Sequence, residues 1–274
     1  KKMFSFKNAK HPLLFGRAVP IDISCGEKFR ILVVTGPNTG GKTVALKTAG
    51  VCTILAWMGF PIPAAEDSCV GDIGEIFADI GDEQSLENDL STYSSHLLNM
   101  KNMMRQASNR TLILIDEFGT GTEPQIGGAI AESVLDKFCS KGAWAVITTH
   151  YQNLKHFADS HSGVVNGAML YDRHEMRALF QLAIGRPGSS FAIEIARKIG
   201  FPEDVIAEAS EIVGSDYIQS DKYLQDIVRD KRYWEGKRQT IRQREKHMEE
   251  TIARYQAEME ELQKSRKEII RQAK

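Results

Sequence analysis

The stretch Gly36-Pro37-Asn38-Thr39-Gly40-Gly41-Lys42-Thr43 decides the fold of this chain. An apolar run, Ile31 to Val34, comes before it, and a segment with helical composition, residues 44–58, follows it. The stretch fits the pattern G-x-x-x-x-G-K-[ST], in which a glycine loop between a strand and a helix wraps around phosphate oxygens. Because strand, glycine loop and helix occur here in that order, the sequence predicts a phosphate-binding loop at residues 36–43.

Each residue type in the loop has a chemical role. Gly36, Gly40 and Gly41 allow backbone N–H groups to turn toward an anion where a Cβ would clash. The helix that follows presents its positive end to the same anion. Lys42 is expected to bridge the β- and γ-phosphates, and the Thr43 hydroxyl to ligate Mg²⁺. We therefore expect this loop to bind ATP together with Mg²⁺.

Two acids follow a second apolar run. Residues 111–115 read Thr-Leu-Ile-Leu-Ile, and Asp116 and Glu117 come directly after them. A parallel strand that ends in this way places its acids at the carboxyl edge of the sheet, beside the phosphate-binding loop. We expect Asp116 to hold Mg²⁺ and Glu117 to act as the general base that polarises the attacking water.

Three further residues are candidates for this edge. His150 ends the next apolar strand, residues 144–148, where it could contact the γ-phosphate or the water. Gln84 follows the strand expected at residues 75–80 and is a candidate sensor of Mg²⁺ or of the attacking water. Ser91 opens a helix, and by itself it has the composition of an N-cap.

Composition and patterning favour a soluble α/β protein. Of the 274 residues, 42% are hydrophobic and 26% are charged, which is ordinary for a globular chain. There is no long apolar run and no signal peptide, and the four cysteines are scattered, so we expect a cytoplasmic protein without a membrane partner. Apolar runs alternate with helical patterns, which predicts a mostly parallel sheet flanked by helices. The expected strands are 29–34, 75–80, 111–115, 144–148, 164–171 and 178–184, and the expected helices are 42–58, 91–107, 125–139, 189–198 and 202–213.

The pattern changes from about Asp221, and we expect an ATPase domain at 1–216 and a long amphipathic helix at 217–274. From Ile227 to Ile269 an apolar residue recurs at every seventh position, although four of the seven companion positions are charged. A helix that rests on its own domain or on a partner, and a partial coiled coil that pairs with itself, both fit this pattern. Residues 221–274 hold 15 Lys or Arg against 11 Asp or Glu, which is too weak an excess for a main nucleic-acid grip.

The order of these motifs resembles that of ABC-type P-loop ATPases, and more specifically the MutS family. The resemblance spans about residues 9–215. It rests on residues 36–42, Ser91-Thr92-Tyr93, the segment 116–122 and Thr148-Thr149-His150. His11-Pro12-Leu13-Leu14 is similar to the family's His-Pro entry strand, which lies near the adenine. By this resemblance Ser91 would act in trans on the nucleotide of a second subunit, ATP would close a homodimer, and hydrolysis would release it.

Within the family the chain is similar to the second bacterial branch, the anti-recombination MutS-like proteins. Thr43-Val44, the segment 81–85 and the segment 185–192 carry this similarity. The resemblance implies a role in the control of recombination or repair, with DNA held by regions mostly absent from residues 1–274.

Two alternatives remain open. The first is the ATPase domain of mismatch-repair MutS. The second is a nucleotide-gated scaffold, in which the long helix recruits a partner such as the ribosome.

Overall fold

The structure is a computed structural model that describes residues 4–14, 16–26, 28–81, 89–172, 175, 177–188, 192–213, 234, 237–238, 240–260, 262 and 264. The chain divides into two units, Lys1–Leu224 and Gln225–Lys274. The described residues between 234 and 264 are helical, in agreement with the predicted character of this segment. The extent of the helix over 217–274, its pairing and the domain boundary at 216 stay predictions.

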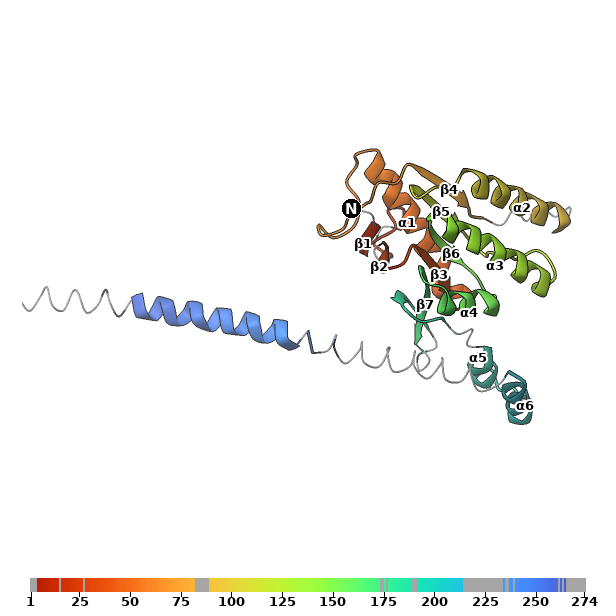
Figure 1. Cartoon of the computed structure of the whole chain (residues 1–274). Coiled ribbons are helices and arrows are strands. Elements are labelled where there is room, and N and C mark those ends of the chain that lie inside the picture. Colours follow the sequence, from red (N-terminus) through yellow and green to blue (C-terminus); the bar gives the residue numbers. More distant parts are fainter. Residues whose placement is uncertain are drawn as a thin grey trace, which may run out of the picture. The chain divides into compact units, whose positions relative to one another are not determined.

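A six-stranded sheet in the order β4-β5-β6-β3-β7-β8 forms the centre of the first unit (Figure 1). Neighbouring strands are parallel except for the β7–β8 pair, which is antiparallel. The mostly parallel α/β sheet predicted from the sequence is therefore confirmed. The strands are β3 Ile31–Thr35, β4 Glu75–Asp79, β5 Thr111–Ile115, β6 Trp144–Thr148, β7 Val164–Asp172 and β8 Arg177–Ile184.

Helices cover both faces of this sheet, because its central strands are apolar on both sides. One face packs against α2, α3 and α4, through residues such as Ile113 and Phe138. The other face packs against α1 and the β1–β2 pair, through residues such as Leu114 and Leu46. The helices are α1 Lys42–Trp57, α2 Asp89–Gln106, α3 Pro124–Ser140, α4 Gln152–Ser160, α5 Ala192–Lys198 and α6 Glu203–Val213.

Four details differ from the expectations. The helix α4, Gln152–Ser160, was not predicted. An antiparallel pair, β1 (Phe4–Ala9) with β2 (Ile21–Cys25), was not predicted. The expected entry strand at residues 11–14 is wrong, because β1 ends at Ala9 and the amide of Leu14 turns back to the carbonyl of His11, 3.1 Å away. Ser91 is not the N-cap of its helix, since α2 already begins at Asp89.

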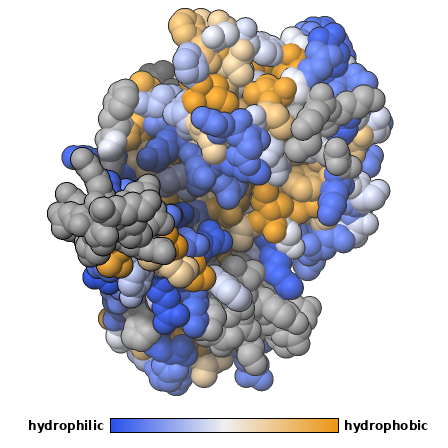
Figure 2. Space-filling model, turned by 90° about the vertical axis from the view of Figure 1, so that its left-hand side faces the viewer, coloured by the Kyte–Doolittle hydropathy of each residue, from blue (hydrophilic) through white to orange (hydrophobic). Residues whose placement is uncertain are grey.

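Some apolar side chains reach the surface. Leu13, Met58 and Ile199 are more than half exposed. On the face shown in Figure 2, apolar and hydrophilic surface are interspersed. Single exposed apolar side chains of this kind are normal for folded proteins and do not by themselves mark an interface. In the described part of the chain, no helix is long and apolar enough to cross a membrane.

Candidate nucleotide site at the carboxyl edge of the sheet

The predicted phosphate-binding loop connects β3 to α1. Residues 38–40 form one turn of 3₁₀ helix, in which the amide of Gly40 donates to the carbonyl of Pro37 over 2.9 Å. Gly36 and Gly41 have φ angles of 138° and 86°, which L-residues with a Cβ rarely adopt. No side chain caps the start of α1, so the amides of its first turn are available to an anion. The loop thus has the shape that its sequence predicts.

Lys42 lies against this loop. Its side chain is buried, and its Nζ donates to the carbonyl of Gly36 over 2.8 Å and lies 3.2 Å from Nε2 of His150. Burial lowers the pKa of Lys42, while the nearby carboxylates of Glu117 and Asp116 oppose that shift. The geometry brings the loop lysine and the histidine after β6 to one point, as expected from parallel strands that end at the same edge.

Asp116 links three elements. Its Oδ2 accepts a 2.6 Å hydrogen bond from the hydroxyl of Thr43 on α1, and its Oδ1 accepts one from the hydroxyl of Thr148 on β6. A hydroxyl and a carboxylate oxygen at this distance are the hard oxygen ligands that Mg²⁺ prefers. The two residues predicted to hold the metal therefore lie together and fit it.

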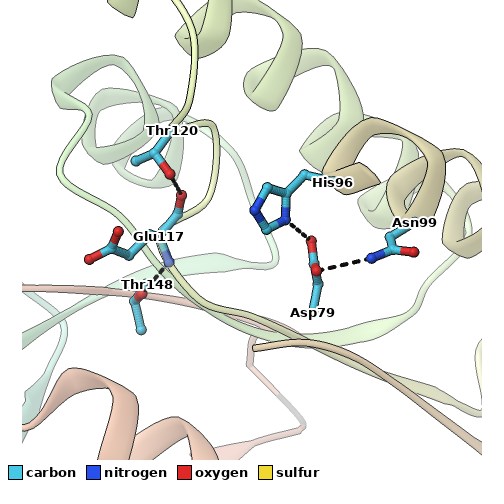
Figure 3. Close-up of polar contacts among 6 residues, drawn as sticks. All are labelled: Asp79, His96, Asn99, Glu117, Thr120 and Thr148. Carbon is cyan, nitrogen blue, oxygen red and sulfur yellow. Dashed lines mark hydrogen bonds and ion pairs between the residues drawn. The ribbon is translucent and has the colours of Figure 1, made fainter. Parts of the chain in front are cut away.

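Glu117 has a strained backbone, with a φ of 50°. Its amide donates to the Thr148 hydroxyl over 2.8 Å, and its carbonyl accepts from the hydroxyl of Thr120 at the same distance (Figure 3). A positive φ is uncommon outside glycine and persists where the surroundings hold it. Here it turns an exposed carboxylate outward from the sheet edge, to the side opposite His96.

His150 follows β6 at the same edge. The amide of the preceding residue, Thr149, donates to the carbonyl of Val34 over 3.2 Å, which ties this segment to β3. The surrounding protein lowers the pKa of His150 by desolvation, and the ammonium groups of Lys42 and Lys155 lower it further. Nε2 of this ring lies within hydrogen-bond distance of the Lys42 ammonium, at 3.2 Å.

A group that sequence reasoning missed lies one strand away. Asp79 ends β4 and is buried; its carboxylate lies 2.7 Å from Nδ1 of His96 and accepts a 3.1 Å hydrogen bond from Asn99 (Figure 3). The backbone carbonyl of Asp79 also accepts from the amide of Asp116 over 2.9 Å. Through these contacts, Asp79 links α2 to Asp116, the acid that follows β5. The sequence shows an acid at a strand end, but not which helix reaches it.

His11 lines a cavity of about 230 Å³ beside the loop, together with Gly41, Val44 and Phe180. Phe180 has a φ of 53°, and its ring approaches Gly41 so closely that a Cβ there would lie 3.0 Å from Cδ1. Sequence analysis missed Phe180, because an aromatic residue within an expected strand carries no functional signal.

Comparison with known proteins agrees with this geometry. Residues 32–215 match the family model described as MutS domain V. The chain belongs to the MutS family. Three similar proteins, each named Endonuclease MutS2, come from Halothermothrix orenii (37% identity over 274 residues, 100% of this chain), Pelotomaculum thermopropionicum (42% over 267 residues, 97%) and Thermomicrobium roseum (48% over 222 residues, 81%).

This chain is a MutS2-type sequence that spans about a third of the length of these curated relatives, between 28% and 35%. The matches support a MutS-like ATPase module. The roles of all the predicted site residues stay predictions, and for two of these residues the structure describes no side chain. Gln84 lies outside the described residues, and Ser91 lies in the first turn of α2 with a side chain that is not described.

Proposed function

We propose that residues 1–216 bind and hydrolyse ATP as the switch module of a MutS-like DNA-binding protein. One observation carries this proposal: Lys42, the adjacent pair Asp116 and Glu117, and His150 come from three segments of the chain and meet at one sheet edge. Hydrogen bonds or charge effects link them. Phosphoryl transfer needs such positioned charges more than covalent chemistry.

Each residue of the edge has an assigned part. Lys42 and the amides of the loop neutralise the phosphates, and His150 accepts a hydrogen bond from the water or contacts the γ-phosphate. Glu117, held in its strained conformation, takes the proton of the attacking water. Mg²⁺, held by Thr43 and Asp116, would supply further neutralisation of phosphate charge when bound. We assign the cavity of His11 and Phe180 to the adenine ring.

ATP binding and hydrolysis would change the oligomeric state of this module. Ser91 of one subunit would face the γ-phosphate held by a second subunit, with the N-terminus of α2 directed at it. ATP then joins two copies, and hydrolysis releases them, with Gln84 as the sensor that reports the metal or the water. ATP hydrolysis would thereby control the association of the two subunits.

The wider role that we propose follows the relatives. Their shared name favours the second branch over mismatch-repair MutS, and with it a cytoplasmic protein that acts on DNA in recombination or repair. DNA would bind through regions that lie mostly outside residues 1–274. No observation favours the scaffold alternative with a ribosome as partner.

The test is the mass of the Glu117→Gln variant in solution, measured by sedimentation with and without Mg²⁺-ATP. Loss of the general base lowers turnover about 10²- to 10⁴-fold and leaves binding intact, so ATP persists in the site. We expect the mass to double from 30.6 kDa on addition of ATP. Lys42→Ala is the control and should stay monomeric. A Glu117→Gln variant that binds ATP as a monomer would refute ATP-driven closure for this chain.

A further inference from the structure

Lys155 is a buried cation behind the phosphate-binding loop. It lies on α4, only 9% of its surface is exposed, and its Nζ donates to the carbonyl of Gly188 over 3.1 Å. Within the part of the chain that the structure describes, no carboxylate pairs with this ammonium. Buried lysines are rare without a paired anion, because the desolvation of an ammonium costs several kcal/mol (on the order of 3 or more).

The residue that Lys155 contacts is packed against the start of the loop. The amide of Gly188 donates to the hydroxyl of Thr35 over 2.5 Å. A Cβ on Gly188 would lie 2.7 Å from the carbonyl oxygen of Thr35 and 2.9 Å from the amide nitrogen of Gly36. Residue 188 therefore lies directly on the junction of β3 and the loop, and only glycine fits there.

Charge connects Lys155 to the same site. Burial, together with the ammonium of Lys42, lowers the pKa of Lys155 to about 8. In turn Lys155 contributes to the lowered pKa of His150. The protein thus gathers positive charge around one loop, and the carboxylates of Asp116 and Glu117, which follow β5, oppose it.

We propose that Lys155 is a positioning residue of the nucleotide site, whose buried charge is balanced by the nucleotide phosphates and which ties the loaded loop to residues 185–188. This inference rests on the proposed nucleotide binding. The segment 185–188 precedes α5 and α6. Through this contact, phosphate binding at the loop can influence the position of those helices. A triphosphate carries more negative charge than a diphosphate, so Lys155 favours ATP over ADP.

A purely structural lysine predicts different behaviour. If Lys155 only anchored Gly188, its loss would destabilise the protein and leave nucleotide preference unchanged. If its charge is balanced only when the phosphates are bound, replacing Lys155 by an uncharged side chain of similar length removes a cation that is uncompensated in the empty protein. The empty protein then keeps or gains stability, while nucleotide binding weakens.

The experiment compares Lys155→Met with wild type and with Lys141→Met. Lys141 is an exposed control for the loss of a lysine that donates to backbone carbonyls: its Nζ donates to those of Arg105 and Ala107, and it follows α3 at the opposite edge of the sheet. Calorimetric titration with Mg²⁺-ATPγS and Mg²⁺-ADP gives the two affinities, and thermal melting gives the stability of the empty protein. We expect Lys155→Met to bind ATPγS about tenfold more weakly, or about 1.4 kcal/mol. The loss for ADP should be smaller, and the melting temperature should not fall.

Each outcome of these measurements supports or overturns a stated claim. Lys155→Met that binds ATPγS as tightly as Lys141→Met overturns the inference, as does an equal loss for both nucleotides. Wild type that binds neither nucleotide overturns the proposed function instead. Should Lys155→Met not fold, amide exchange of wild type decides. Mg²⁺-ATPγS should slow exchange of the Gly188 amide, and unchanged exchange there would refute the tie.

Discussion

Replacing Thr148 by valine tests how the catalytic edge is held. The Thr148 hydroxyl is buried, donates to Oδ1 of Asp116 and accepts from the amide of Glu117. One oxygen thus positions both the predicted metal ligand and the predicted general base. Valine keeps the shape and the β-branch but removes the oxygen, so we expect both acids to lose their restraint while the strand persists.

The magnitude follows from the bonds that are lost. A hydrogen bond to a charged group contributes about 1.5–3 kcal/mol, and a buried donor left unpaired costs about 1–3 kcal/mol. The positive φ of Glu117 stores strain of about 1–3 kcal/mol, which its bonds to Thr148 and Thr120 must hold. We therefore expect Thr148→Val to lower the free energy of unfolding by about 2–3 kcal/mol. Turnover should fall about 10- to 100-fold, or about 1.4–2.7 kcal/mol of activation free energy.

Thr149→Val is the control. Thr149 is equally buried, donates to the carbonyl of Phe118 and accepts from the amide of Tyr151, both over 3.1 Å. It therefore also loses one donated and one accepted hydrogen bond without touching either acid, and its donated bond goes to a neutral carbonyl instead of a carboxylate. Urea unfolding measures the stability of both variants, and release of phosphate at saturating Mg²⁺-ATP measures turnover. If Thr148→Val turned over ATP within twofold of Thr149→Val, the hydroxyl would not be what positions the acids.

Three further results are expected. The pKa of His150 is lowered in the folded protein by burial and by two ammonium groups, so the unfolded chain binds the proton more readily. The contribution of His150 to the free energy of unfolding is therefore present above the unfolded pKa of 6.5 and is lost as pH falls through the folded pKa. In His150→Asn, the midpoint of urea unfolding should depend less on pH over this acid range. Phe180→Ala should weaken binding of a fluorescent ATP analogue about 3- to 10-fold through loss of an aromatic contact, and unchanged affinity would remove Phe180 from the base pocket. His96→Ala leaves the buried Asp79 carboxylate with one fewer partner and should cost about 1–3 kcal/mol in urea unfolding, whereas an unchanged midpoint would mean that the pair adds nothing.

The site was predictable where chemistry dictates local sequence. Gly36 to Thr43 must present amides, an ammonium and a hydroxyl within a few residues, so their spacing is visible in the chain. Asp116, Glu117 and His150 follow apolar strands, and the rule that parallel strands end at one edge brings them together. Apolar runs also predicted the six strands of the sheet, most clearly for β3, β5 and β6, which are buried on both faces and therefore apolar throughout.

Other parts of the site depend on contacts between distant segments. Phe180 reaches the loop only because β8 pairs antiparallel with β7 and carries a positive φ at that residue. Asp79 meets His96 through the packing of α2, and no local pattern specifies which turn of a helix faces a strand end. Lys155 lies on a helix where a lysine is usually solvated, so its burial under Gly188 is a tertiary result.

Two threonines show why the sequence predicts this edge of the sheet only in part. Thr35 ends β3 and Thr148 ends β6, where a β-branched residue is read simply as a strand former. In the folded protein each hydroxyl both donates and accepts: Thr35 to Gly167 and from Gly188, Thr148 to Asp116 and from Glu117. The last residue of each strand therefore continues the sheet with its backbone and fixes the loops of the site with its side chain. A serine there would keep the oxygen but leave χ1 free, so the methyl group of threonine is itself part of how the loops are held.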